Sequence, residues 1–144
     1  MAEFKLVLGR GDGKSFQRVV KGKEAEALLK KRIGDRISGK DIGMEGYEFE
    51  IKGGSDKCGF PMRKGIQRTR QKIMISGKGV GFCGKDRNKK KQKGLKKKKT
   101  VCGERISRSI VQINLKILKE GKEKLGEEKK EEGGKEPQEK KAES

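Results

Sequence analysis

The chain has 144 residues, of which 42% are charged and 29% hydrophobic, and its formal net charge at pH 7 is +19. This composition predicts one domain with a small core, and no apolar stretch approaches the roughly 18 residues that a membrane span needs. The N-terminus MAEFKLVLGR lacks the plan of a signal peptide, so we expect a cytoplasmic protein.

The first predicted elements are two strands. Phe4, Leu6 and Leu8 alternate with less apolar positions, and extended character resumes over residues 15–20, after the turn-rich segment GRGDGK. Two strands joined by a glycine-rich turn predict a β-hairpin.

A helix is predicted next, over residues 23–33. Ala25, Leu28, Leu29 and Ile33 recur there at helical spacing, and Gly34 follows as a stop signal. No other segment predicts a helix as clearly.

Three more strands follow, because apolar and polar residues alternate over 47–51, 72–76 and 111–117. Each of these strands should bury one face. Together with the hairpin they predict a mainly β fold over residues 1–118, a small β-barrel or strongly bent antiparallel sheet with one short helix.

Two long connections, 53–71 and 77–100, separate these strands and carry most of the charge. Residues 57–99 hold 17 basic side chains and a single acid, Asp86. Loops longer than about 15 residues are uncommon in compact domains unless they are functional or disordered. We therefore predict that this region binds nucleic acid through Lys57, Arg63, Lys64, Arg68, Arg70, Lys72, Lys85, Arg87, Lys89, Lys90, Lys91, Lys93, Lys96, Lys97, Lys98 and Lys99.

The densest part of this charge is residues 85–99, KDRNKKKQKGLKKKK, in which Leu95 is the one sizeable apolar residue. Such a segment repels itself and buries little surface, so it should be extended or disordered until a polyanion neutralises it. In the first loop, Phe60 could stack on a base or anchor the loop to the barrel. We favour anchoring, because a lone aromatic ring makes a weak stacking platform.

The sequence gives little support to catalysis, a metal or a cofactor. It has no histidine, and Cys58, Cys83 and Cys102 are scattered without a CxxC pair, which argues against both a zinc site and a disulfide framework. The acids alternate with lysines on what should be solvated faces. Two segments, GDGKS and GVGFCG, resemble phosphate-binding loops but lack the helix that such a loop requires.

Residues 119–144 are rich in glutamate and lysine and contain one large apolar residue, Leu125. A segment with so little to bury is predicted to be a disordered, solvated tail. Its charge is nearly balanced, so it should not extend the basic surface.

Five segments carry a resemblance to a known family. They are EFKLVL near the N-terminus, SFQRVVKGKEAEALLKKRIGD at 15–35, GGSDKCGFPMR at 53–63, GLKKKKTVCGERIS at 94–107, and IVQINLKI at 110–117. In order and over residues 1–118, the chain resembles the archaeal form of small-subunit ribosomal protein six of the archaeal and eukaryotic type.

This resemblance implies a small β-barrel without catalytic activity that binds small-subunit ribosomal RNA and neighbouring ribosomal proteins in the cytoplasm. It assigns RNA contacts to Lys57 and Arg63 in the first motif and to residues 96–99 in the second. The charge pattern alone leaves an alternative open. A free-standing nucleic-acid-binding protein, such as an RNA chaperone or a DNA-packing module, should bind duplex DNA and structured RNA alike.

Overall fold

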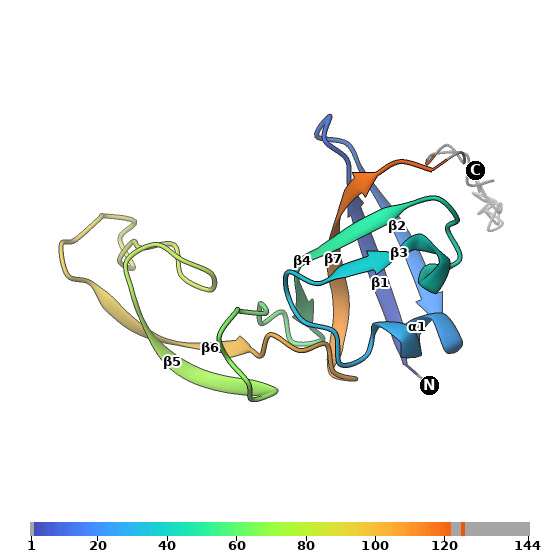
Figure 1. The fold of residues 1–144 in the computed structure, drawn as a ribbon. Helices are drawn as coiled ribbons and strands as arrows, with labels where there is room; N and C mark the ends of the chain where they lie inside the picture. Colours follow the sequence, from blue (N-terminus) through green and yellow to red (C-terminus); the bar gives the residue numbers. More distant parts are fainter. Residues whose placement is uncertain (1, 122–124, 126–144) are drawn as a thin grey trace, which may run out of the picture.

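The computed structural model describes residues 2–121 and 125. Its regular structure is mainly β, arranged as a curled sheet with a two-stranded ribbon projecting from it (Figure 1). In chain order the elements are β1 (Glu3–Gly9), β2 (Ser15–Lys21), α1 (Lys23–Leu28), β3 (Arg36–Ser38), the 3-10 helix η1 (Gly39–Ile42), β4 (Glu48–Asp56), β5 (Arg70–Ser76), β6 (Lys96–Cys102) and β7 (Ile110–Lys119).

The curled sheet has the strand order β2-β1-β7-β4-β3. Neighbouring strands pair antiparallel, apart from β1 and β7, which run parallel. α1 contacts both β2 and η1, and η1 contacts β3. The two short helices therefore lie between the edge strands of the bent sheet, and the architecture is a half-barrel.

The main core fills the inside of this half-barrel, as the alternating pattern requires. Phe4, Leu6 and Leu8 of β1 are at most 1% exposed, and the partners of Leu6 and Leu8 on β7 are the equally buried Ile113 and Leu115. Each such side chain contributes roughly 1.5 to 3 kcal/mol through burial. The half-barrel is thus a stable base for the segments that project from it.

A second, smaller core belongs to the ribbon of β5 and β6. Ile66, Ile75, Phe82 and Val101 form this cluster, and Ile73 and Leu95 pack against it. The cluster includes residues from the long connections, so these connections fold back over one face of the ribbon.

The prediction of a mainly β fold with a strongly bent sheet and one short helix is confirmed, as is the N-terminal hairpin. The helix is shorter than predicted, because α1 ends at Leu28 and not near Ile33. Leu29 is extended (ψ 144°) and Lys30 is left-handed (φ 68°), and the Lys30 N–H donates to the Ile106 carbonyl at 3.0 Å. Leu29 and Ile33 still pack against the main core, although they lie beyond the end of the helix. Their burial explains why apolar residues recur here at a spacing that resembles that of a helix.

Three elements were not predicted, namely β3, η1 and β6. β6 begins inside the lysine run that sequence analysis assigned to a loop at 77–100, and β4 likewise continues to Asp56 in the predicted loop at 53–71. Pairing with β5 and burial of Val101 supply the stabilisation that the lysines of β6 lack. The loops between strands are therefore 57–69 and 77–95.

Most of the predicted tail at 119–144 lies outside the described residues. In the part that is described, Glu120 forms an ion pair with Arg10, with 2.5 Å between Glu120 Oε1 and Arg10 Nε, and Leu125 packs against the main core. None of the helices in the described residues is long and apolar enough to cross a membrane.

Two adjacent glycines in β4 allow a matched test of the sheet. A Cβ on Gly54 would lie 2.3 Å from the Gln112 carbonyl oxygen of β7, whereas a Cβ on Gly53 would meet no atom within 4 Å. We expect Gly54→Ala to lower the free energy of unfolding by about 1 to 3 kcal/mol, because strand backbones must move apart. Gly53→Ala should change it by less than about 0.5 kcal/mol. Equal effects in urea unfolding would contradict this account of the close strand approach.

Candidate nucleic-acid interface

The basic side chains gather on one projecting part of the molecule, which we call the arm and define as residues 57–102. It contains the ribbon and the connections 57–69 and 77–95, and it extends away from the half-barrel (Figure 1). Within it, backbone hydrogen bonds organise the lysine-rich connection. The Asp86 N–H donates to the Lys90 carbonyl at 2.9 Å, and Lys85 pairs with Lys91 across a β-bridge.

The ribbon has two different faces, because directly opposed residues of an antiparallel pair share a face. One face carries Ile73, Ile75 and Val101 and is covered by the smaller core. The other carries Lys72 opposite Thr100, Met74 opposite Lys98, and Ser76 opposite Lys96. This second face, which we call the basic face, is open to solvent, and Met74 is 60% exposed on it.

Of the sixteen predicted nucleic-acid-binding residues, most are exposed and make no ion pair with another described residue. These are Lys57, Lys64, Arg68, Lys72, Lys85, Arg87, Lys89, Lys90, Lys91, Lys93, Lys96, Lys98 and Lys99. The arm thus holds many free cations on one extension of the fold.

Three of the predicted residues have partners within the protein. Lys97 lies 3.7 Å from Asp86, the single acid of residues 57–99. Arg63 is partly buried and donates to the Val80 carbonyl at 3.3 Å, where it ties the two connections together. Arg70 pairs with Asp56, so its charge is already partly compensated.

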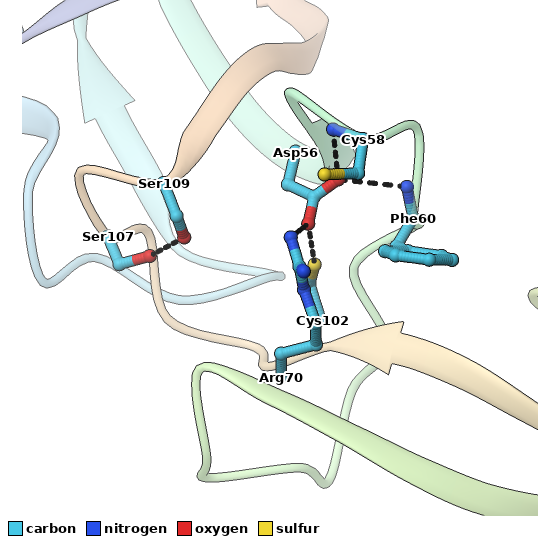
Figure 2. Close-up of polar contacts among 7 residues, drawn as sticks. All are labelled: Asp56, Cys58, Phe60, Arg70, Cys102, Ser107 and Ser109. Atoms are coloured by element: carbon cyan, nitrogen blue, oxygen red, sulfur yellow. Dashed lines mark hydrogen bonds and ion pairs between the residues drawn. The ribbon is translucent and has the colours of Figure 1, made fainter.

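Asp56 is the centre of a polar junction between the half-barrel and the arm (Figure 2). Its carboxylate is fully buried. One oxygen accepts the backbone N–H groups of Cys58 and Phe60 at 2.8 and 3.0 Å, which is an Asx-type turn at the start of the arm. The other oxygen accepts the Cys102 thiol at 3.3 Å and the Arg70 guanidinium.

The strand register explains why these groups meet. Arg70 and Cys102 are directly opposed at the base of the ribbon, so both side chains leave the same face toward Asp56. The Arg70 guanidinium also lies 5.0 Å from the centre of the Phe60 ring, and Phe60 packs against the main core. The predicted anchoring role of Phe60 is therefore confirmed.

The junction also shifts two pKa values. Burial alone would raise the pKa of Asp56, but the hydrogen bonds from Phe60, Arg70, Cys102 and Cys58 together lower it below its ordinary value. Burial, with Asp56 beside it, raises the pKa of the Cys102 thiol to about 11. The thiol is therefore protonated near neutral pH and serves as a hydrogen-bond donor to Asp56.

The sequence analysis missed the role of Asp56. A signal was present, since an aspartate that begins a glycine-rich turn is the pattern of an Asx turn. In the described residues, no three histidine, cysteine or acidic side chains lie together in a way that could hold a metal ion.

Comparison with known protein families identifies the family of this chain. The family model described as Ribosomal protein S6e matches residues 4–129 of this chain. The chain belongs to this family.

Individual relatives agree. The chain is 43% identical over 128 residues to the small ribosomal subunit protein eS6 of Archaeoglobus fulgidus, covering 87% of this chain and 94% of the relative. The eS6 protein of Methanococcus maripaludis (strain C5) is 40% identical with the same coverage. That of Halorubrum lacusprofundi is 38% identical over 82% of this chain and 84% of its own length.

Membership in the S6e family confirms the resemblance that the sequence motifs carried. A ribosomal protein acts in the cytoplasm as part of the ribosome and is not an enzyme, as predicted. The matched range, residues 4–129, includes the whole arm.

Proposed function

We propose that this chain is a structural component of the small ribosomal subunit that binds and stabilises folded ribosomal RNA through phosphate contacts from the arm. The observation that carries the proposal is the basic face, an open, regular surface of Lys72, Lys96 and Lys98 without ion pairs to described residues. The unpaired lysines of the connection 77–95 extend this positive surface toward the end of the arm.

The chemistry of these side chains favours recognition of the RNA backbone over its sequence. Lysine ammonium groups neutralise phosphates as point charges, whereas an arginine such as Arg68 can form two parallel hydrogen bonds to one phosphate. Double-stranded RNA is contacted mostly through its shape, phosphates and 2′-hydroxyls. A rigid two-stranded ribbon that carries lysines at regular intervals suits such contacts.

The distribution of charge favours the arm as the main source of these phosphate contacts. The acids of residues 57–99 are limited to Asp86, which Lys97 compensates, so RNA phosphates would meet little repulsion there. On the half-barrel, acids and bases alternate, and they pair with each other at Glu3–Lys21 and Glu48–Lys119. Neighbouring ribosomal proteins would then meet the half-barrel while the arm reaches into RNA.

Sedimentation tests this function directly. A tagged full-length chain, expressed in archaeal cells, should migrate with small ribosomal subunits in a gradient and be released by RNase or by a high-salt wash, because phosphate contacts weaken with salt. The same tag on an unrelated basic protein is the control. Absence of the chain from the small-subunit fraction at low salt, or equal recovery on bulk DNA, would overturn the proposal.

A further inference from the structure

A cavity of about 350 Å³ opens where the half-barrel meets the base of the arm. Three segments that are distant in the sequence form its wall: the chain just after α1, the end of the connection 57–69, and the connection between β6 and β7. Its lining residues are Leu29, Lys30, Gln67, Arg68, Thr69, Arg105, Ile106, Ser107 and Arg108. We call this cavity the basic pocket.

The lining of the basic pocket is strongly cationic. Lys30, Arg68, Arg105 and Arg108 are all exposed, none makes an ion pair with another described residue, and no acid lines the cavity. Glu104, which precedes Arg105 in the sequence, accepts the Gly65 N–H at 2.9 Å and lies 3.7 Å from Arg32. Four uncompensated cations around one cavity indicate an anionic ligand.

The walls of the pocket are held by backbone hydrogen bonds. Two backbone hydrogen bonds join residues 30 and 31 to Ile106. The Lys30 N–H donates to the Ile106 carbonyl at 3.0 Å, and the Ile106 N–H donates to the Lys31 carbonyl at 2.9 Å. The Gly103 N–H donates to the Thr69 carbonyl at 3.1 Å. The pocket is therefore formed before any ligand arrives, which reduces the entropy cost of binding.

The pocket is not built for phosphate alone. The half-buried Leu29 contributes an apolar surface, which a bare phosphate would not use, and the buried Ile106 lies behind the wall as part of the main core. Gln67, Thr69 and Ser107 add uncharged donors and acceptors that match the edge of a nucleobase. The volume falls in the range of roughly 300 to 1,000 Å³ that is usual for small-ligand sites.

We propose that the basic pocket receives one unpaired nucleotide of the bound RNA. The base would rest on Leu29 and stack on arginine guanidinium planes, while the flanking phosphates contact the arginines at the rim. Sequence-specific proteins recognise RNA mainly at such unpaired, splayed-out bases. This inference rests on the proposed RNA-binding function, but it adds a second mode of contact, distinct from the phosphate contacts of the arm.

The test compares two RNA hairpins that differ by one unpaired nucleotide. The full-length chain should bind the hairpin with a single-nucleotide bulge about tenfold more tightly than the perfect duplex, because only the bulge offers an unpaired base that can stack on arginine guanidinium planes. The double variant Arg105→Gln/Arg108→Gln should lose this preference. Both arginines are exposed, so the variant should fold normally, which its melting temperature checks.

A control variant with the same charge change is Lys89→Gln/Lys91→Gln, in the connection 77–95. It should weaken binding to both hairpins equally and keep the preference for the bulge. Failure of the unmodified chain to bind either hairpin would refute the proposed RNA-binding function. Equal binding to both hairpins, or a preference that survives in the arginine variant, would refute the pocket alone.

Free nucleotides and acidic peptides supply related chemistry, so both enter the experiment as competitors. Uridine monophosphate and a glutamate-rich peptide should displace the bulged hairpin only at concentrations far above its dissociation constant. Displacement by either at a comparable concentration, lost in the arginine variant, would reassign the pocket and overturn the proposal.

Discussion

Replacement of Lys72, Lys96 and Lys98 with glutamine is expected to weaken binding to structured small-subunit RNA about 100-fold at a salt concentration of about 0.1 M. The plot of log affinity against log salt should become shallower by about 2 to 3, because each lost phosphate contact removes a slope of roughly 0.7 to 0.9. Filter binding or anisotropy over a salt series measures both quantities. These three lysines lie on the basic face and are exposed, so the fold should be unaffected.

A triple variant on the half-barrel provides the matched control. Lys5, Lys14 and Lys23 are exposed, lack ion pairs with described residues and lie outside the arm. Their replacement with glutamine lowers the net charge by the same amount, but should change the slope by less than about 1. If the two variants lost equal affinity, binding would depend on net charge and the basic face would not be the interface.

Deletion of the lysine run at 85–99 is a poorer test of the interface than these substitutions. Residues 96–99 belong to β6, and their removal would unpair β5 and expose Ile75 and Val101 of the smaller core. Loss of binding after such a deletion could come from a disrupted arm. Substitutions on the basic face keep every backbone hydrogen bond of the ribbon and therefore separate charge from structure.

The contrast between the two sheets shows what sequence reasoning can recover. In the half-barrel, alternation of large apolar residues in β1 and β7 marks each buried face, because one side of the sheet packs on a continuous core. In β6 the pattern is hidden, since Lys97 and Lys99 occupy positions on the face that carries Ile73 and Ile75. That face is completed by Phe82 and Leu95 from the connection, which no local pattern indicates.

The exposure of most basic side chains in residues 57–99 was predictable from their charge density, and their internal contacts were not. Charge density could not separate free cations from those with partners within the protein. Arg70 and Lys97 differ from their neighbours only through Asp56 and Asp86, to which the folded chain brings them. Lys30, Arg105 and Arg108 of the basic pocket were missed because they converge from segments that are isolated in sequence.

Loss of the Asp56 side chain should strongly destabilise the protein. Asp56→Ala leaves the N–H groups of Cys58 and Phe60 and the Cys102 thiol without their acceptor. We expect the free energy of unfolding to fall by about 3 kcal/mol, within the range for loss of a partner from a buried polar network. Urea unfolding measures it, and hydrogen exchange in β6 should show faster opening of the arm.

Asp12 serves as the control for this change. It is an exposed acid whose carboxylate lies 3.3 Å from Arg10, so Asp12→Ala should lower the free energy of unfolding by less than about 0.5 kcal/mol.

Asp56→Asn distinguishes the two sets of hydrogen bonds that the Asp56 carboxylate accepts. An asparagine oxygen can still accept the N–H groups of the Asx turn, whereas its amide group would face the Arg70 and Cys102 donors, so the loss should be smaller than in the alanine variant.

The pH dependence of the same variants distinguishes charge from shape. Folding lowers the pKa of Asp56, so its ionised form adds stability that is complete above the unfolded-state pKa of about 3.9 and is lost as pH falls through the lower folded-state value. Asparagine does not titrate. The difference in unfolding free energy between the natural chain and Asp56→Asn should therefore stay constant from neutral pH to about pH 5 and shrink below about pH 4. A difference that did not shrink in acid would show that packing, and not the buried charge, holds the arm to the half-barrel.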